Sequence, residues 1–151
     1  VIEFQHSAMK PEELKSREEF YENMVWIVDG CRGELDLGHF RISLGGQISD
    51  NPVAHSLQWW GRSKLFDNWI QATKPVFIDF GQSDLWRLVS FNRTTKRGVV
   101  GPIGREYLIE DLTLGNPLAK ILRQADVAEP NPEIRPPQLS LFETSGPDPH
   151  Q

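Results

Sequence analysis

The chain has 151 residues, of which 38% are hydrophobic and 25% charged, so it has enough apolar sequence to bury one core. No apolar run approaches the roughly 18 residues that would span a membrane, and no secretion signal opens the sequence. Cys31 is the only cysteine, which excludes an internal disulfide and a cysteine-rich zinc site and fits a reducing cytoplasm. The net charge of -5 gives no support for a globally basic surface that binds nucleic acid.

The first 30 residues predict a β-α-β unit. Residues 1–6 alternate as a strand does, residues 11–24 carry a helical stripe that begins with a proline, and residues 25–28 form an apolar run. Asp29-Gly30 then marks a turn. A helix of this length between two strands predicts that the strands lie parallel. We expect the first strand to be central in a mixed sheet.

Residues 31–58 are rich in glycine, serine and aspartate and show little periodicity, although their apolar residues between 35 and 44 can supply one or two short strands. Farther on, a hairpin is the clearest signal, because two strand-like runs flank Gly81-Gln82-Ser83-Asp84. The expected class is therefore α/β with a mixed sheet, flanking helices and a C-terminal hairpin and helix extension. The further expected elements are a helix at 62–72, strands at 76–80, 85–91 and 98–101, and helices at 105–112 and 117–124.

The composition changes near residue 126. Six of the 11 prolines lie in the last 22 residues, where Leu139-Ser140-Leu141-Phe142 is the only apolar cluster. That composition cannot form a core, so we expect a folded domain over residues 1–125 and a disordered tail over residues 126–151. Because a strand already starts at Val1, we also expect the natural domain to begin upstream.

Two polar side chains of the first strand are candidates for chemistry. Glu3 and Gln5 are two residues apart, so both stand on one face of the strand. Metal-dependent nucleases use such a pair, in which a carboxylate holds Mg²⁺ and a neighbouring polar group orients water or contacts the phosphate. Taken alone, Glu-x-Gln is more often a polar surface. Arg17, on the apolar face of the following helix, either reaches Glu3 or a DNA phosphate, or pairs with a surface glutamate.

The sequence VIEFQHSAMKPEELKSREEFYENMVWIVDG resembles the nuclease-like domain of the competence protein CoiA family, and KPVFIDFGQSDLWRLVSF is similar to that family's hairpin. The resemblance covers residues 1–112 in two blocks. It implies a partial PD-(D/E)XK nuclease core, with Glu3 as a ligand of Mg²⁺ or Mn²⁺, Gln5 in the usual place of lysine, and no other cofactor. It implies action on DNA in uptake, recombination or repair.

The same resemblance implies that half of the metal site lies elsewhere. The first metal-binding aspartate of this fold precedes the strand that carries Glu3, so the chain as given is expected to be inactive unless upstream sequence supplies that residue. The alternative is a non-catalytic adaptor with a decayed nuclease fold. Such an adaptor would bind DNA or the sliding clamp of the bacterial DNA polymerase III.

Other residues have a structural and a functional interpretation. Trp59 and Trp60 beside Arg62 and Lys64 either form a stacking platform for single-stranded DNA or belong to the core. His6 beside Glu3 is expected to be packed rather than catalytic. Asp29 and Asp79 are expected to bond to the backbone of the turns that follow their strands.

The tail contains a candidate recruitment peptide. Gln138-Leu139-Ser140-Leu141-Phe142 resembles the pentapeptide by which many bacterial polymerases and repair factors bind the DNA polymerase III sliding clamp. Leu139, Leu141 and Phe142 lack a core of their own in this proline-rich segment, and Gln138 would fix the orientation. The alternative is that these side chains fold back onto the domain.

A synthetic peptide that covers residues 135–144 is expected to bind purified sliding clamp with an affinity of around micromolar, measured by calorimetry. Burial of Leu141 or Phe142 in an apolar pocket contributes roughly 1.5–3 kcal/mol each, so changing both to alanine should remove binding. Ser140→Ala, at the position expected to face outward, is the matched control and should bind as the parent does. Equal binding by all three peptides would show that the motif is a chance match.

Overall fold

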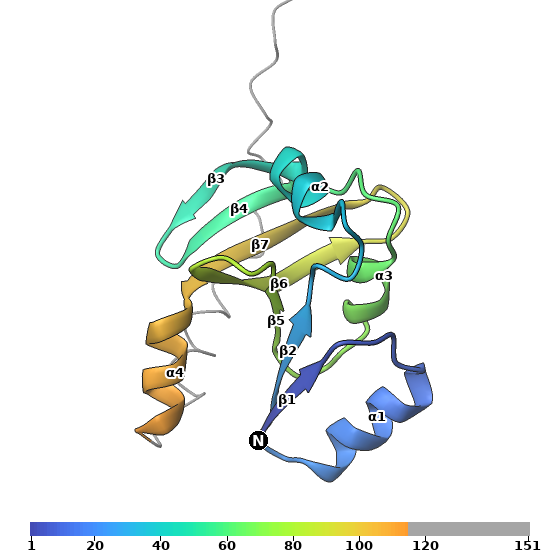
Figure 1. Ribbon diagram of the computed structural model, residues 1–151, viewed down its shortest axis with the longest axis vertical. Helices are drawn as coiled ribbons and strands as arrows, with labels where there is room; N and C mark the ends of the chain where they lie inside the picture. Colours follow the sequence, from blue (N-terminus) through green and yellow to red (C-terminus); the bar gives the residue numbers. More distant parts are fainter. Residues whose placement is uncertain (115–151) are drawn as a thin grey trace, which may run out of the picture.

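The computed structural model describes residues 1–114, which form a seven-stranded mixed sheet with helices on both faces (Figure 1). The expected α/β class is therefore confirmed. The expected helix at 117–124, the domain boundary at 126 and the peptide at 138–142 lie outside the described residues. Within residues 1–114, no helix is long and apolar enough to cross a membrane. The elements are β1 (Ile2–Gln5), α1 (Pro11–Phe20), β2 (Val25–Asp29), α2 (Asp36–Ser43), β3 (Leu44–Asp50), β4 (Val53–Gln58), α3 (Leu65–Trp69), β5 (Val76–Asp79), β6 (Asp84–Asn92), β7 (Arg97–Gly104) and α4 (Arg105–Thr113).

The expected β-α-β unit is present at the N-terminus. β1 and β2 pair in parallel, with Glu3 opposite Trp26, and α1 connects them. Pro11 opens the helix at a position where a missing N–H costs nothing. The helix ends at Phe20, earlier than the expected residue 24, because Tyr21 adopts an extended backbone with φ -106° and ψ 106°.

β1 lies at one edge of the described sheet, whose strand order is β1-β2-β5-β6-β7-β4-β3, so our expectation of a central strand is wrong. β2 instead has parallel neighbours on both sides, β1 and β5. Composition explains the difference. The apolar residues of β2 are at most 8% exposed, whereas β1 alternates and leaves the Phe4 side chain 64% exposed. A strand buried on both faces is apolar throughout, and β1 is not.

The other half of the sheet is antiparallel, and the hairpin formed by β5 and β6 is confirmed. Gly81 in its turn has φ 72°, in the left-handed region that favours glycine. β7 is longer than the expected strand at 98–101. It tolerates Pro102 because its pairing with β4 ends at Val100, so the missing N–H interrupts no bond to that strand.

The segment expected to form one or two short strands between residues 35 and 44 instead forms helix α2. The alternating apolar residues there are not alternately buried, because Leu35 and Ile42 are exposed while Phe40 is 3% exposed. The side chain of Asp36, in the first turn, accepts the Gly33 N–H at 2.9 Å. α3 is shorter than the expected helix at 62–72, and α4 matches the expected helix at 105–112.

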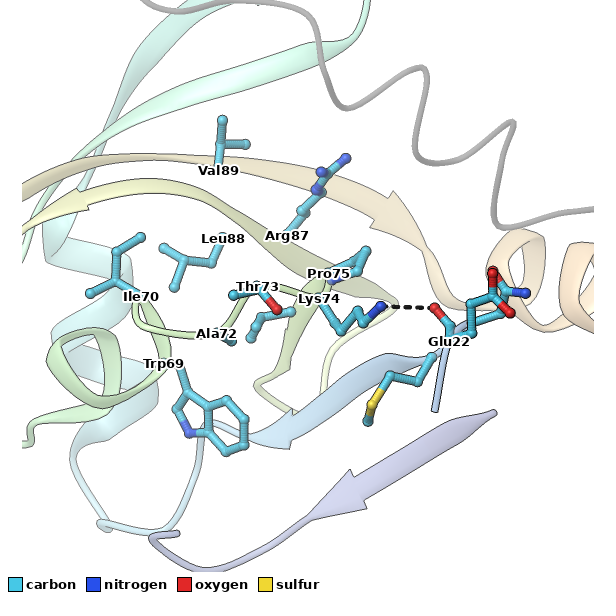
Figure 2. A pocket seen from close by; sticks show the side chains of 13 residues that line it. Glu22, Trp69, Ile70, Ala72, Thr73, Lys74, Pro75, Arg87, Leu88 and Val89 are labelled. Carbon is cyan, nitrogen blue, oxygen red and sulfur yellow. Dashed lines mark hydrogen bonds between the residues drawn. The ribbon is translucent and has the colours of Figure 1, made fainter. Parts of the chain in front are cut away.

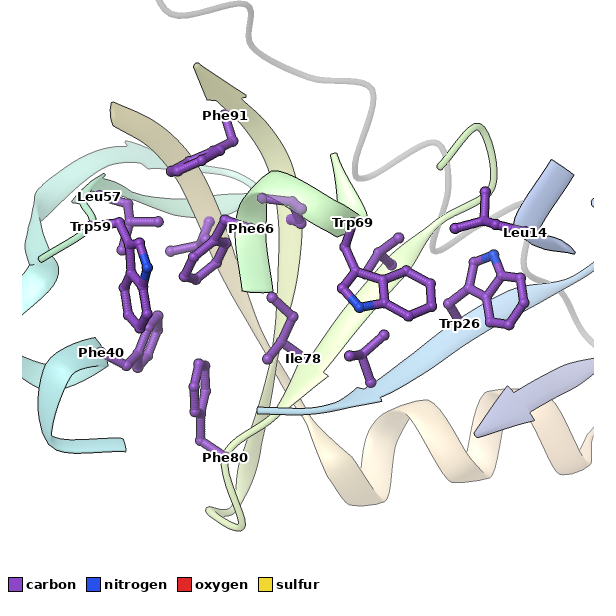
Figure 3. Packing of buried hydrophobic residues seen from close by; sticks show 14 of the residues in the cluster. Leu14, Trp26, Phe40, Leu57, Trp59, Phe66, Trp69, Ile78, Phe80 and Phe91 are labelled. Carbon is purple, nitrogen blue, oxygen red and sulfur yellow. The ribbon is translucent and has the colours of Figure 1, made fainter. Parts of the chain in front are cut away.

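The sheet has a large core on one face and a small core on the other. α1, α2 and α3 cover the large core, in which Trp26 packs against Trp69 with ring centroids 5.2 Å apart and Phe40 stacks on Phe80 at 4.1 Å (Figure 3). α4 covers the small core through Leu108. Each face of the sheet is thus fixed by its own helices, and the ends of the parallel strands are held in place between them.

One buried carboxylate joins α1 to the rest of the large core. Glu18 is 6% exposed and accepts hydrogen bonds from Trp26 Nε1 at 2.9 Å, from the Thr73 hydroxyl at 2.7 Å, and from the backbone N–H groups of Thr73 and Lys74. Burial by itself raises the pKa of Glu18, but the hydrogen bonds from Thr73, Trp26 and Lys74 together hold that pKa below its usual range. Glu18 is therefore charged, and its hydrogen bonds stabilise the folded state.

Glu18→Gln should lower the free energy of unfolding by about 2–3 kcal/mol near neutral pH, because an amide has one acceptor oxygen in place of two charged ones. The Glu18 pKa is lowered on folding, so its contribution is complete above the ordinary carboxyl pKa of about 4.3 and is lost as pH falls toward the folded-state value. The gap between wild type and variant in urea unfolding should therefore shrink in acid. Glu19→Gln, at the exposed neighbouring carboxylate, is the control and should change stability by less than about 0.5 kcal/mol.

Candidate functional site

Glu3 and Gln5 both face the side of the sheet that α1 covers, because their register partners are Trp26 and Val28 of the large core. They do not share a cleft, however. Glu3 lines a shallow cavity against α1, with Arg17 and neighbouring helix residues. Gln5 lines a separate cleft at the end of its strand. The two side chains thus stand on one face of β1, as expected from their spacing, but they line different cavities.

Glu3 is held in an ion-paired group with α1. The Arg17 guanidinium donates to Glu3 Oε2 at 3.0 Å and to Glu13 Oε1 at 2.6 Å. The hydrogen bond with Glu13 is the largest effect on the Arg17 pKa, which is raised despite partial desolvation because both carboxylates favour the charged form. Both placements expected for Arg17 are present, because the guanidinium lies beside Glu3 and also pairs with the surface carboxylate of Glu13. The group has two carboxylates and one guanidinium, so it carries a net negative charge.

The described residues do not form a complete Mg²⁺ site. Mg²⁺ binds oxygen ligands and is usually held by one or two carboxylates together with waters and substrate phosphates. One oxygen of Glu3 is committed to Arg17, and the Gln5 amide donates to the Ser7 carbonyl at 2.9 Å and to its hydroxyl at 3.1 Å. Nowhere in residues 1–114 do three histidine, cysteine, aspartate or glutamate side chains converge as metal ligands would. A metal bound at Glu3 would therefore complete its coordination with waters, substrate phosphates or donors from outside residues 1–114.

The cleft beside Gln5 has a volume of about 610 Å³, within the range of roughly 300–1,000 Å³ typical of ligand pockets. It lies where β1 and β2 end, between α2 and α3. Three cations on its rim, Arg32, Arg62 and Lys64, are exposed, and no ion pair joins any of them to an acid within the described residues. Asp36 on its wall is 7% exposed. Sequence reasoning missed this cleft, because the segment that supplies α2 and Arg32 has no clear periodicity.

A row of polar residues lies at the ends of the parallel strands on the opposite face. Asp29 and Asp79 are register partners, and the expectation that each bonds to its turn is confirmed. Asp29 accepts the Cys31 N–H at 2.8 Å and Asp79 accepts the Gly81 N–H at 2.7 Å. His6 lies 3.5 Å from Asp29 and its side chain is 81% exposed, so the expectation that it is packed is wrong.

Asp79 also joins the end of β5 to α4. Arg105 donates to both of its oxygens, at 2.8 and 2.6 Å. The hydrogen bonds from Arg105 hold the pKa of Asp79 below its usual range, against the opposing effect of burial. Burial raises the pKa of the nearby Cys31 thiol, and the negative charges of Asp29 and Asp79 raise it further. A thiol kept protonated in this way is a poor nucleophile, so this face lacks an activated cysteine.

A third cavity, of about 460 Å³, opens beside the large core near the connection from α3 to β5 (Figure 2). The Lys74 ammonium points along its wall and donates to the Glu22 carbonyl at 2.8 Å. Trp69, Ile70 and Leu88 supply apolar walls. Its polar and apolar groups thus belong to the packing of α1 and α3, and we assign it no chemistry.

The two adjacent tryptophans have different environments, which resolves the two interpretations that the sequence leaves open. Trp59 is 3% exposed and packs against Phe66 with ring centroids 4.8 Å apart, so it belongs to the core. Trp60 is 64% exposed, and its backbone N–H donates to the Ser43 hydroxyl at 3.0 Å. Only Trp60 is available to a partner molecule.

Comparisons of the chain with models of known families, with curated proteins and with solved structures give no match.

Proposed function

We propose that this chain is a nuclease-like domain that acts on DNA phosphodiesters, with a partial PD-(D/E)XK core. The observation that carries the proposal is the β1-α1-β2 unit, which has parallel strands and places Glu3 and Gln5 on one face of β1. It is supported by the resemblance of two sequence blocks to the CoiA family. The described β5 and β6 hairpin falls in the second of those blocks.

In this proposal residues 1–114 hold reacting groups in position, but they do not by themselves supply every group that the reaction needs. Arg17 fixes the Glu3 carboxylate from one side, at 3.0 Å. Gln5 has no acid-base capacity, so its amide can only donate to a phosphate or orient water. Mg²⁺ or Mn²⁺ remains the proposed cofactor, and it requires ligands beyond Glu3. Recruitment to DNA through Gln138, Leu139, Leu141 and Phe142 on the sliding clamp is part of the same proposal.

A non-catalytic DNA-binding or clamp-associated adaptor is the second candidate. It is favoured by one specific observation, the pairing of Glu3 with Arg17 in a group that offers no second free carboxylate on β1. An adaptor needs the nucleic-acid-binding surface and the tail peptide but no metal. The nuclease is therefore expected to cleave DNA and the adaptor is not, whereas both are expected to bind DNA.

In the natural full-length protein, Glu3→Ala should reduce Mg²⁺-dependent cleavage of DNA by more than about 100-fold, because loss of a metal ligand costs at least as much as loss of its supporting groups. The Glu3 side chain is partly exposed and Arg17 keeps its pair with Glu13, so the variant should stay folded. Glu12→Ala is the matched control, since it removes an exposed carboxylate of α1 that forms no ion pair with Arg17 and leaves β1 intact. Gel assays with a labelled duplex and with a labelled single strand would measure DNA cleavage by both variants.

DNA binding without any Mg²⁺-dependent cleavage by the full-length protein would favour the adaptor. Cleavage that survives in Glu3→Ala at the wild-type rate would reject Glu3 as a ligand and with it the proposed nuclease site.

A further inference from the structure

Five cations gather at one end of the molecule, which we call the basic end: Arg62, Lys64, Arg93, Lys96 and Arg97. They come from the segment between β4 and α3 and from the turn between β6 and β7 with the first residue of β7, which lie side by side next to α3 (Figure 1). Backbone and side-chain bonds hold these two segments together, since the Trp59 N–H donates to the Lys96 carbonyl at 2.8 Å.

The charge of the basic end is largely uncompensated. Residues 58–69 and 91–98 contain a single acid, Asp67, which pairs with Lys96. The other four cations form no ion pair within the described residues, although the chain as a whole carries a net charge of -5. Such a local excess of positive charge on an acidic protein indicates a polyanionic partner.

Two of the arginines are fixed with their terminal nitrogens unused. Arg93 Nε donates to the Asp67 carbonyl at 3.0 Å, and Arg97 Nε donates to Gln58 Oε1 at 2.9 Å. The described residues offer no acceptor to the terminal nitrogens of either guanidinium. An arginine anchored through Nε presents its two terminal nitrogens as a fork, which matches the oxygens of a phosphate group. The basic end is therefore suited to a phosphodiester backbone rather than to isolated anions.

An exposed aromatic ring adjoins these cations. Trp60 is 64% exposed and lies two residues after Gln58, the anchor of Arg97, and two residues before Arg62. A base that is not stacked in a duplex can lie on such a ring, whereas paired bases in a double helix cannot reach it. Arg62 and Lys64 also line the cleft that contains Gln5, which Arg32 and the acids Asp29, Glu34 and Asp36 line as well, so nucleic acid bound at the basic end lies at the rim of that cleft.

We propose that the basic end and Trp60 bind single-stranded nucleic acid, with phosphates on the arginines and a base stacked on Trp60, and place the strand at the rim of the cleft beside Gln5. This deepens the proposed function, on which it rests for the identity of the polymer as DNA, and it names the form of the substrate. Binding at this surface needs no metal, so it can be measured apart from cleavage.

The test uses the full chain in EDTA and a labelled oligothymidylate of about 16 nucleotides, followed by fluorescence anisotropy, with a duplex of equal length as competitor. Trp60→Ala should weaken binding roughly 5- to 100-fold, and Trp60→Phe should retain most of it, because one stacked base is lost only in the first variant. Phe20→Ala, at a ring that is 79% exposed on α1, is the matched control and should bind as wild type does.

The double variant Arg93→Ala, Arg97→Ala should reduce the magnitude of the negative slope of log affinity against log salt concentration by about 1.4, because two phosphate contacts are lost. Lys10→Ala with Lys15→Ala, two exposed lysines of the α1 region, should leave that slope unchanged. Thermal unfolding of each variant checks that the fold is intact.

No binding of the single strand, equal affinity for the duplex, or wild-type affinity in Trp60→Ala would each overturn this inference. Single-strand binding in EDTA without Mg²⁺-dependent cleavage would contradict the nuclease proposal alone. Cleavage of duplex DNA without single-strand binding would contradict the present inference alone.

Discussion

The buried carboxylate of Glu18 is the constraint on which the placement of α1 depends. It is the point where α1, β2 and the connection into β5 meet, through Trp26 and Thr73. A charge removed from water is stable only when its hydrogen-bonding capacity is filled, and here four donor groups fill it. Because Arg17 precedes Glu18 on the helix, fixing Glu18 also fixes the side from which Arg17 approaches Glu3. A structural hydrogen-bond network therefore determines the geometry of the candidate site.

The distribution of charge gives the molecule two distinct ends. α1 and its neighbourhood carry the acids Glu12, Glu13, Glu19 and Glu22 against the cations Lys10, Lys15 and Arg17, whereas the basic end beside α3 has five cations and one acid. A polyanion is therefore attracted to the basic end more strongly than to α1. Glu3 itself lines the separate cavity against α1, next to acidic side chains of that helix. Net charge conceals this arrangement, because it averages over both ends.

Sequence reasoning predicted the parts of the fold that depend on local periodicity. The parallel unit of β1 and β2, the hairpin at Gly81 and helix α4 follow from apolar runs and turn residues that are visible in the sequence. Strand position in the sheet could not be predicted, because it depends on which strands pair at long range. Helix α2 was missed because its apolar residues alternate, and only the structure shows that Phe40 is buried while Ile42 is exposed.

The candidate site also has residues that the sequence indicated and residues that it did not. Glu3, Gln5 and Arg17 were identified from spacing and from a family resemblance, and the contact between Glu3 and Arg17 agrees with that identification. Of the basic end, only Arg62 and Lys64 were identified, beside the two tryptophans, because the other cations come from a segment about 30 residues farther along the sequence. Trp60 shows the limit most clearly. Its neighbour Trp59 has the same residue type, and the sequence contains no signal that distinguishes the buried ring from the exposed one.

The ion-paired group around Arg17 is asymmetric, and this asymmetry bears on what Glu3 can do. Arg17 and Glu13 are one helical turn apart on α1, and a guanidinium nitrogen of Arg17 lies 2.6 Å from Glu13 Oε1. Glu3 belongs to a different element, and its Oε2 lies 3.0 Å from the Arg17 guanidinium. If Glu3 changes partner, Arg17 keeps a carboxylate and does not become an unpaired, partly buried cation. The cost of releasing Glu3 is therefore smaller than the loss of an isolated pair would suggest. Glu13 thus leaves Glu3 available for chemistry while the helix keeps its position on the sheet.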